Sequence, residues 1–99
     1  MPIYMTARFR VQPESVQTCL YAINDFVDHI KANEPGTLQY TSVQEYDDSF
    51  SFLNFFAFED EAAEELHRES AGTRRFVDAL YPNLVGDVEF TRFGAVAST

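Results

Sequence analysis

The run from Phe50 to Phe58 constrains the fold of this 99-residue chain more than any other segment. Successive side chains of a strand point to opposite faces of the sheet. One face of this run therefore carries four phenylalanines and Asn54, and the other carries Leu53, Phe55 and Ala57. Since a strand with one solvated face carries polar residues at alternate positions, we expect a strand that is covered on both faces.

The residues before this run predict a strand, a helix and a second strand. Apolar residues alternate with polar ones from Ile3 to Val11, which is the period of a strand. Pro13 suits a first helical turn, and an apolar helical stripe follows at Val16, Leu20, Ile23, Val27 and Ile30. The triplet Glu34-Pro35-Gly36 ends this helix, and residues 37–46 are expected to form the next strand.

The residues around and after the phenylalanine run predict a hairpin, an interrupted helix and a last strand. The polar triplet 47–49 separates two β-prone segments, which is typical of an antiparallel hairpin. Asp60 is the expected N-cap of a helix stabilised by a Glu64–Arg68 pair. This helix is interrupted at 70–72 and restarts with Thr73 as its cap and with Phe76, Val77 and Leu80 buried. Residues 86–96 complete the pattern as a strand.

This order predicts an α+β chain with the ferredoxin-like split βαβ topology, strand-helix-strand-strand-helix-strand, as a single domain over residues 1–99. Two helices cover only one face of the four-stranded sheet. Leaving Leu53 and Phe55 exposed on the other face would forgo about 1.5–3 kcal/mol each. We therefore expect a symmetric homodimer, packed sheet against sheet with Leu53 and Phe55 in the interface.

The charge and the cysteine content limit the partners that this protein can bind and the compartment in which we expect it. Sixteen acidic residues against seven basic ones give a net charge of −9, which repels nucleic acid and anionic membrane surfaces. No run approaches the ~20 apolar residues of a membrane span, and residues 1–4 lack the features of a signal peptide. The single cysteine, Cys19, allows no internal disulfide and is expected to be buried. We expect a cytoplasmic protein without nucleic-acid or membrane partners.

Several residues carry a resemblance to a known family: Glu34-Pro35-Gly36, Tyr40, Phe58, His67, Ser70 and Phe76. With these residues the chain resembles the antibiotic-biosynthesis monooxygenase family, in its quinol-monooxygenase-like branch, whose members are dimeric α+β barrels. The resemblance implies cofactor-independent oxidation of a small phenolic, quinol or polyketide-like aromatic by O₂. Such chemistry requires an apolar cavity for a flat ring and one or two polar groups that share the phenolic proton.

Three polar residues are candidates for this chemistry. His67 lies at the boundary of the apolar stripe of its helix and can exchange protons near neutral pH; a structural histidine is the alternative. Asn54 is an amide among rings, and it either orients substrate or bonds backbone or water. Tyr40 either orients a substrate oxygen or places its hydroxyl in water. The expected walls of the pocket are Met5, Ala7, Phe52, Phe56 and Phe58.

The chain also departs from the family pattern. Phe56 and Gly72 stand where many members have a glutamate and a second histidine that transfer protons. Val77 stands where haem-degrading members have their iron ligand, so haem degradation is not expected. His29, four residues after Asp25, is expected to form a solvated pair with it, and no zinc or iron site is predicted. Two alternatives to the enzyme remain: a non-catalytic dimeric barrel that binds a small apolar ligand, and an assembly domain whose pocket is filled by phenylalanines.

Overall fold

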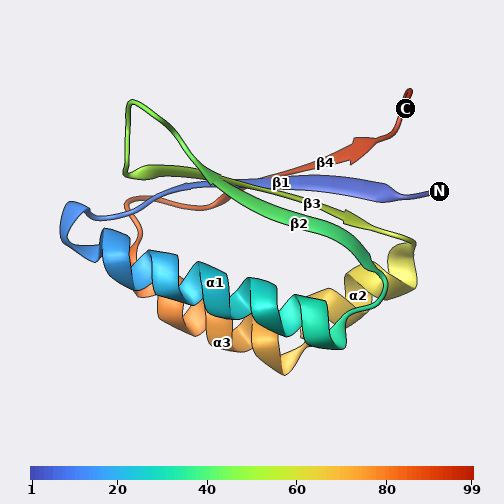
Figure 1. Cartoon of the computed structure of the whole chain (residues 1–99), viewed down its shortest axis with the longest axis horizontal. Coiled ribbons are helices and arrows are strands. Elements are labelled where there is room, and N and C mark those ends of the chain that lie inside the picture. Colours follow the sequence, from blue (N-terminus) through green and yellow to red (C-terminus); the bar gives the residue numbers. More distant parts are fainter.

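The computed structural model describes residues 1–99 as a four-stranded antiparallel sheet with all helices on one face (Figure 1). The elements in chain order are β1 (Ile3–Arg10), α1 (Val16–Asn33), β2 (Thr37–Gln44), β3 (Ser51–Phe58), α2 (Glu61–Glu69), α3 (Ala71–Leu80) and β4 (Glu89–Gly94). Short 3₁₀ turns at Pro13–Ser15 and Tyr81–Asn83 lead into α1 and out of α3. The strand order β2-β3-β1-β4 confirms the ferredoxin-like topology, with β3 and β1 in the centre.

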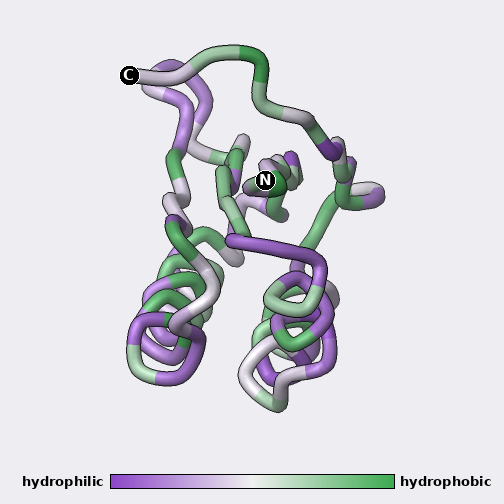
Figure 2. The backbone as a smooth tube through the Cα atoms, turned by 90° about the vertical axis from the view of Figure 1, so that its right-hand side faces the viewer, coloured by the Kyte–Doolittle hydropathy of each residue, from purple (hydrophilic) through white to green (hydrophobic).

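The helices form two columns beneath the sheet, α1 in one and α2 with α3 in the other (Figure 2). The buried stripe of α1 is Cys19, Ile23, Phe26 and Ile30. It is rotated relative to the predicted stripe, of which Val16, Leu20 and Val27 are only partly buried. Phe26 stacks on Phe76 of α3 with ring centroids 4.3 Å apart, so the contact between the two helices sets the rotation of α1. Cys19 is buried, as expected.

The second helical segment begins and breaks close to the predicted positions. Asp60 caps α2, because its Oδ1 accepts the backbone N–H of Ala63 at 2.8 Å. The predicted cap of α3 is wrong: Ser70, not Thr73, accepts the backbone N–H at the start of α3, over 3.0 Å. The Thr73 hydroxyl instead donates to the carbonyl oxygen of His67 at 2.5 Å. This bond ties the first turn of α3 to the end of α2.

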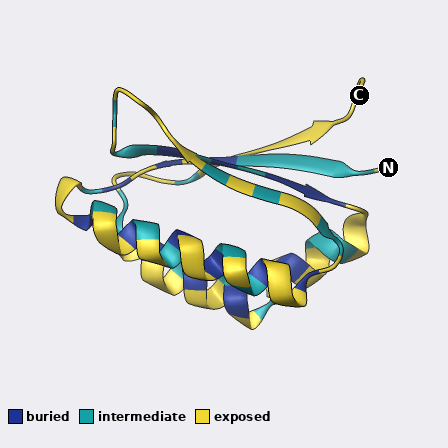
Figure 3. Cartoon of the chain, in the orientation of Figure 1, coloured by how far each residue is buried: buried dark blue, intermediate teal, exposed yellow.

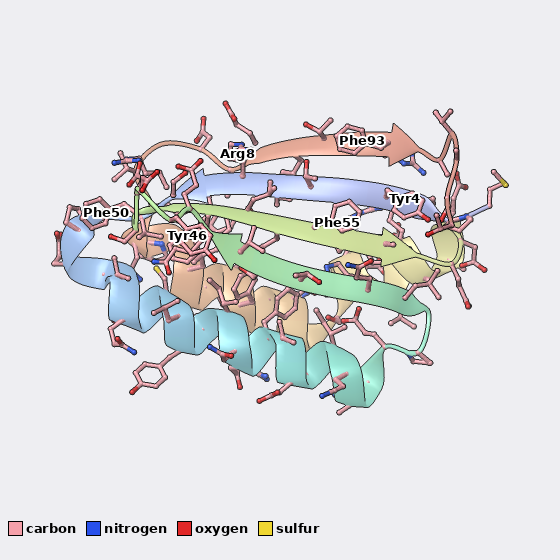
Figure 4. The ribbon with its side chains drawn as sticks, turned by 45° about the horizontal axis from the view of Figure 1, so that its top comes forward. Tyr4, Arg8, Tyr46, Phe50, Phe55 and Phe93 are labelled. Carbon is pink, nitrogen blue, oxygen red and sulfur yellow. The ribbon has the colours of Figure 1, made fainter.

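The two faces of β3 differ in what covers them. On the helix side its side chains are buried, and Phe52 stacks on Phe9 of β1 at 5.4 Å (Figure 3). On the other side Leu53 and Phe55 are half-buried and no helix lies over them. Figure 4 shows Phe55 on this outer face with Tyr4 of β1 and Phe93 of β4. None of the helices combines the length and the apolar character that a membrane crossing requires.

Candidate active site

A buried carboxylate contacts His67. The Nδ1 atom of His67 lies 2.8 Å from Oε1 of Glu34, and the Glu34 side chain is 1% exposed. The Thr37 hydroxyl donates to the same Oε1 at 2.8 Å. Glu34 ends α1, and the turn that follows packs against α2 at Gly36, where a Cβ would lie 2.6 Å from the Cβ of Ala63. Glycine at this position thus allows the close approach that brings Glu34 to His67.

The His67 ring is held in one orientation by this contact and by four aromatic rings. Because Nδ1 faces a carboxylate, which only accepts, Nδ1 carries the ring hydrogen. Nε2 makes no hydrogen bond with the protein, and the ring borders a cavity. The surrounding centroids lie 5.0 to 6.0 Å from that of His67 and belong to Phe26, Tyr40, Phe56 and Phe58. This arrangement leaves a proton acceptor exposed to an apolar space.

The cavity beside His67 has a volume of about 520 Å³. Its lining residues come from β1, β3, both helices of the second column, the turn after them and β4: Met5, Phe56, Phe58, Glu64, His67, Arg68, Thr73, Val77, Tyr81 and Phe90. The cavity therefore disfavours the alternative in which phenylalanines fill this space. A more open depression of about 790 Å³ lies between Ile3, Glu61 and Arg92, but none of its lining residues is buried.

A smaller hollow of about 70 Å³ also borders His67 and Phe56, and it contains the other two predicted polar residues. Asn54 donates from Nδ2 to the Tyr40 hydroxyl at 2.9 Å and accepts from the Ser42 hydroxyl at 2.6 Å. Asn54 thus bonds two neighbouring side chains. Burial raises the pKa of Tyr40 well above the usual range of a phenol. Tyr40 therefore keeps its hydrogen and can donate it to a ligand.

The structure brings most of the predicted site residues together. Met5, Phe56 and Phe58 line the larger cavity with His67, while Ala7, Tyr40 and Asn54 line the smaller one. Phe52 lines neither and belongs to the packed core against Phe9. Sequence reasoning missed Thr73, Val77, Tyr81 and Phe90 as lining residues.

Glu34 was also missed, because its place before Pro35 marks it as part of a turn. One feature of the sequence could have indicated that Glu34 has a special role. A carboxylate at the C-terminus of a helix is repelled by the negative end of the helix dipole. A glutamate at this position therefore needs a partner elsewhere, which the structure shows to be His67.

The expected pairing of His29 with Asp25 is wrong. Asp25 instead accepts a hydrogen bond from Arg75 of α3 at 3.0 Å. The side chain of His29 is 18% exposed, and its Nε2 lies 4.0 Å from Oε2 of Glu34. The ring faces the second helical column, where it lies against Gly72 of α3, because residue 29 is on the same side of α1 as the buried Phe26, three residues before.

The fold and this site define an α+β protein with a ferredoxin-like sheet and an apolar cavity that holds a histidine–carboxylate pair. The model of the antibiotic biosynthesis monooxygenase family matches residues 2–79. The chain therefore belongs to the antibiotic biosynthesis monooxygenase family. No curated protein is significantly similar to it.

Solved structures from several organisms share the fold. A candidate antibiotic biosynthesis monooxygenase of Caulobacter crescentus is 22% identical with a TM-score of 0.91, over 97% of this chain and 91% of its own. The Mycobacterium tuberculosis protein Rv0793 is 17% identical with a TM-score of 0.90, over 99% of this chain and 98% of its own. A Deinococcus radiodurans protein with the same family name is 16% identical with a TM-score of 0.86, over 98% and 95%. At such low sequence identities, the structural similarity shows that these proteins and this chain share a fold.

Proposed function

We propose that this protein is a cofactor-independent monooxygenase that oxidises a small phenolic, quinol or polyketide-like aromatic with O₂. The observation that carries the proposal is the Glu34–His67 pair at the wall of an apolar cavity of about 520 Å³. A carboxylate-oriented imidazole is suited to general-base catalysis, and the largely apolar walls suit a flat ring.

In the proposed reaction, Nε2 of His67 takes the phenolic proton. The O–H bond breaks, its electron pair stays on the substrate oxygen, and a new N–H bond forms. Glu34, 2.8 Å from Nδ1, stabilises the resulting imidazolium. The electron-rich anion then reacts with O₂. One oxygen atom enters the product and the other leaves as water with two substrate hydrogens, so that a hydroquinone becomes a hydroxylated quinone and no outside reductant is required.

Tyr40 and Asn54 are proposed to orient the substrate oxygens from the smaller hollow. The Tyr40 oxygen already accepts a hydrogen bond from Asn54, so its own hydrogen remains free to be donated. Neither side chain has to move or change charge to do so. Met5, Phe56 and Phe58 are proposed to hold the ring in the larger cavity, within reach of His67.

The functional unit is proposed to be a homodimer that packs through the outer face of the sheet. Support comes from the apolar residues of this face, which no helix covers. Tyr4 and Phe55 pack together with ring centroids 6.0 Å apart, and Val43 and Phe93 are each about half exposed, at 49% and 47%. A second copy of the same face is complementary by symmetry, and it would bury this surface without any further element of the chain.

Oxygen uptake with a panel of hydroquinones, naphthols and anthrones tests the activity. We expect His67→Gln to lower kcat/KM by about 10²–10⁴-fold, the usual contribution of a general base. Glu69→Gln, on the exposed surface of the same helix, is the matched control and should leave the rate unchanged. An unaffected His67→Gln variant would remove the proposed role. Tight binding of a panel member without oxygen consumption would instead favour the non-catalytic binding module.

A further inference from the structure

Two buried polar atoms in this protein have no hydrogen-bond partner, and they face each other. They are Nε2 of His29 and Oε2 of Glu34, 4.0 Å apart. Buried polar groups almost always have partners, so such a pair needs an explanation. The other oxygen of the same carboxylate is bonded to His67. Glu34 thus stands between two imidazoles, one from each column of helices.

The tautomer of His29 follows from its neighbour one turn later on α1. Asn33 places its amide nitrogen 3.2 Å from Nδ1 of His29 and 2.9 Å from the His29 carbonyl oxygen. Because this amide donates, Nδ1 of His29 accepts, and the ring hydrogen is on Nε2. The N–H of His29 therefore points toward the unpartnered oxygen of Glu34. A small rotation of either side chain closes the gap to hydrogen-bond length.

Gly72 makes the space for this ring. It is buried in the first turn of α3, and a Cβ at this position would overlap the His29 imidazole. The nearest atoms to that Cβ are all ring atoms of His29. Any residue larger than glycine would therefore displace the imidazole from its present position. Gly72 provides a way to displace His29 without changing its chemistry.

We propose that His29, Glu34 and His67 form one proton-sharing cluster, in which His29 is a positioning residue that acts on His67 through Glu34. The inference rests on the proposed function and deepens it. With Glu34 ionised and both rings neutral, the cluster has a charge of −1. The proton taken from the substrate by Nε2 of His67 makes the cluster neutral. A second proton would give a buried net positive charge, so the two rings titrate as a coupled pair.

His29 lowers the pull of the carboxylate on a proton at His67. Its N–H, 4.0 Å from Oε2, attracts part of the negative charge that would otherwise act on His67 alone. We therefore expect that loss of the His29 N–H would strengthen the hold of Glu34 on a proton at His67. Metal binding does not explain the arrangement, because no group of three His, Cys, Asp or Glu side chains is placed to hold an ion.

Other titratable groups near the cluster have partners of their own or do not titrate in this range. On α1, Asp25 bonds Arg75 of α3 at 3.0 Å. On α2, Glu64 pairs with Arg92 of β4 at 3.4 Å and lies 3.9 Å from Arg68. From β2, Tyr40 packs against the His67 ring, and burial raises its pKa. The changes described below therefore belong to the two imidazoles and Glu34.

The test follows the titration of the imidazole signals by NMR, which needs no substrate and is simplified because the chain has only two histidines. In the wild type we expect each ring to report two inflections. In His29→Leu, His67 should titrate in a single step whose midpoint lies about half to one pH unit higher. Gly72→Ala should shift His67 in the same direction although both histidines remain. His29→Gln, which retains an amide donor, should restore much of the wild-type midpoint.

A His67 titration that is identical in the wild type, His29→Leu and Gly72→Ala would overturn the proposal. If His29→Leu does not fold, Gly72→Ala decides the result by itself. In oxygen uptake, His29→Leu should move the acid limb of the kcat/KM profile to higher pH by the same half to one unit, whereas a merely structural role would lower the rate equally at every pH. Coupled titration without any oxygen consumption would overturn the proposed activity and leave the cluster in place.

Discussion

The two faces of the sheet carry phenylalanines from the same strand, but only one face is covered. On the inner face Phe52 is 2% exposed, because α1 and α3 pack over it. On the outer face Phe55 stays half-buried beside Tyr4, with no helix above it (Figure 4). Alternate positions of one strand thus have different roles. The inner set forms the core of the subunit, and the outer set is, by our proposal, reserved for a second copy.

The inner face is itself divided into a packed end and a hollow end. At the packed end Phe52 stacks on Phe9, and Phe9 also lines the smaller hollow. Three of the four buried polar residues, Glu34, Asn54 and His67, border or adjoin the cavities at the hollow end. Polar groups are therefore buried where space for a ligand remains, which is what a binding site requires and what a core avoids.

The largest expected effect comes from removing an aromatic side chain at the packed end. Phe52→Ala should lower the free energy of unfolding by about 3–5 kcal/mol, because a fully buried ring leaves a cavity. Phe55→Ala, the matched change on the outer face, should cost about half as much at concentrations low enough to dissociate the proposed dimer, since its ring is then partly in solvent. Urea denaturation followed by circular dichroism measures both. Equal losses would mean that the two faces do not differ as described.

The second effect concerns association through the outer face. Phe55→Arg should weaken self-association by about 100-fold or more, because a two-fold interface carries the substitution twice and each buried ring is worth about 1.5–3 kcal/mol. Sedimentation velocity at a series of concentrations gives the constant. Tyr21→Arg, an aromatic on the exposed side of α1, is the control and should not change it. A wild-type chain that is monomeric at micromolar concentration would contradict the dimer.

The smallest effect concerns Tyr40 at the hollow end and includes a part that depends on pH. Burial raises the pKa of this phenol above its unfolded value. The folded state therefore keeps the proton above about pH 10 while the unfolded chain loses it, and stability falls with rising pH by about 1.4 kcal/mol per unit. Tyr40→Phe should reduce this slope, to which Tyr81 and Cys19 also contribute because burial raises their pKa values. It should also cost about 1 kcal/mol at all pH values, because Asn54 loses an acceptor.

Urea denaturation at a series of pH values between neutral and alkaline measures that slope. Tyr46→Phe is the control, since Tyr46 lies fully exposed in the β2–β3 hairpin. It should leave the slope unchanged. A Tyr40→Phe variant with the wild-type slope would assign the alkaline loss of stability to other groups.

Local patterns predicted the topology but not the ends of the elements. The last strand covers Glu89–Gly94 and not residues 86–96, and the second covers Thr37–Gln44 and not residues 37–46. Both are edge strands with a single neighbour each. Their ends depend on where that neighbour stops, which no periodicity records. The rotation of α1 and the cap at Ser70 likewise depend on contacts between the helices.

Only some residues of the candidate site could be predicted, because contacts between remote segments leave no local pattern in the sequence. His67 and Asn54 stand out in the sequence because they are polar residues beside apolar ones. His29 and Glu34 do not, since each has an ordinary role in a helix or a turn. Gly72 was read as the loss of a proton-transfer group, yet its missing side chain leaves room for the ring of His29.

The amino-acid sequence alone determined the order of the elements and the apolar character of both faces of β3, because these depend on alternation and turn residues within short segments. The tertiary structure alone decided that Glu34 lies between His29 and His67. Glu34 and His67 are 33 positions apart, and their contact depends on how the turn after α1 packs against α2. Distances between remote side chains are set by such packing and are not encoded in any local pattern.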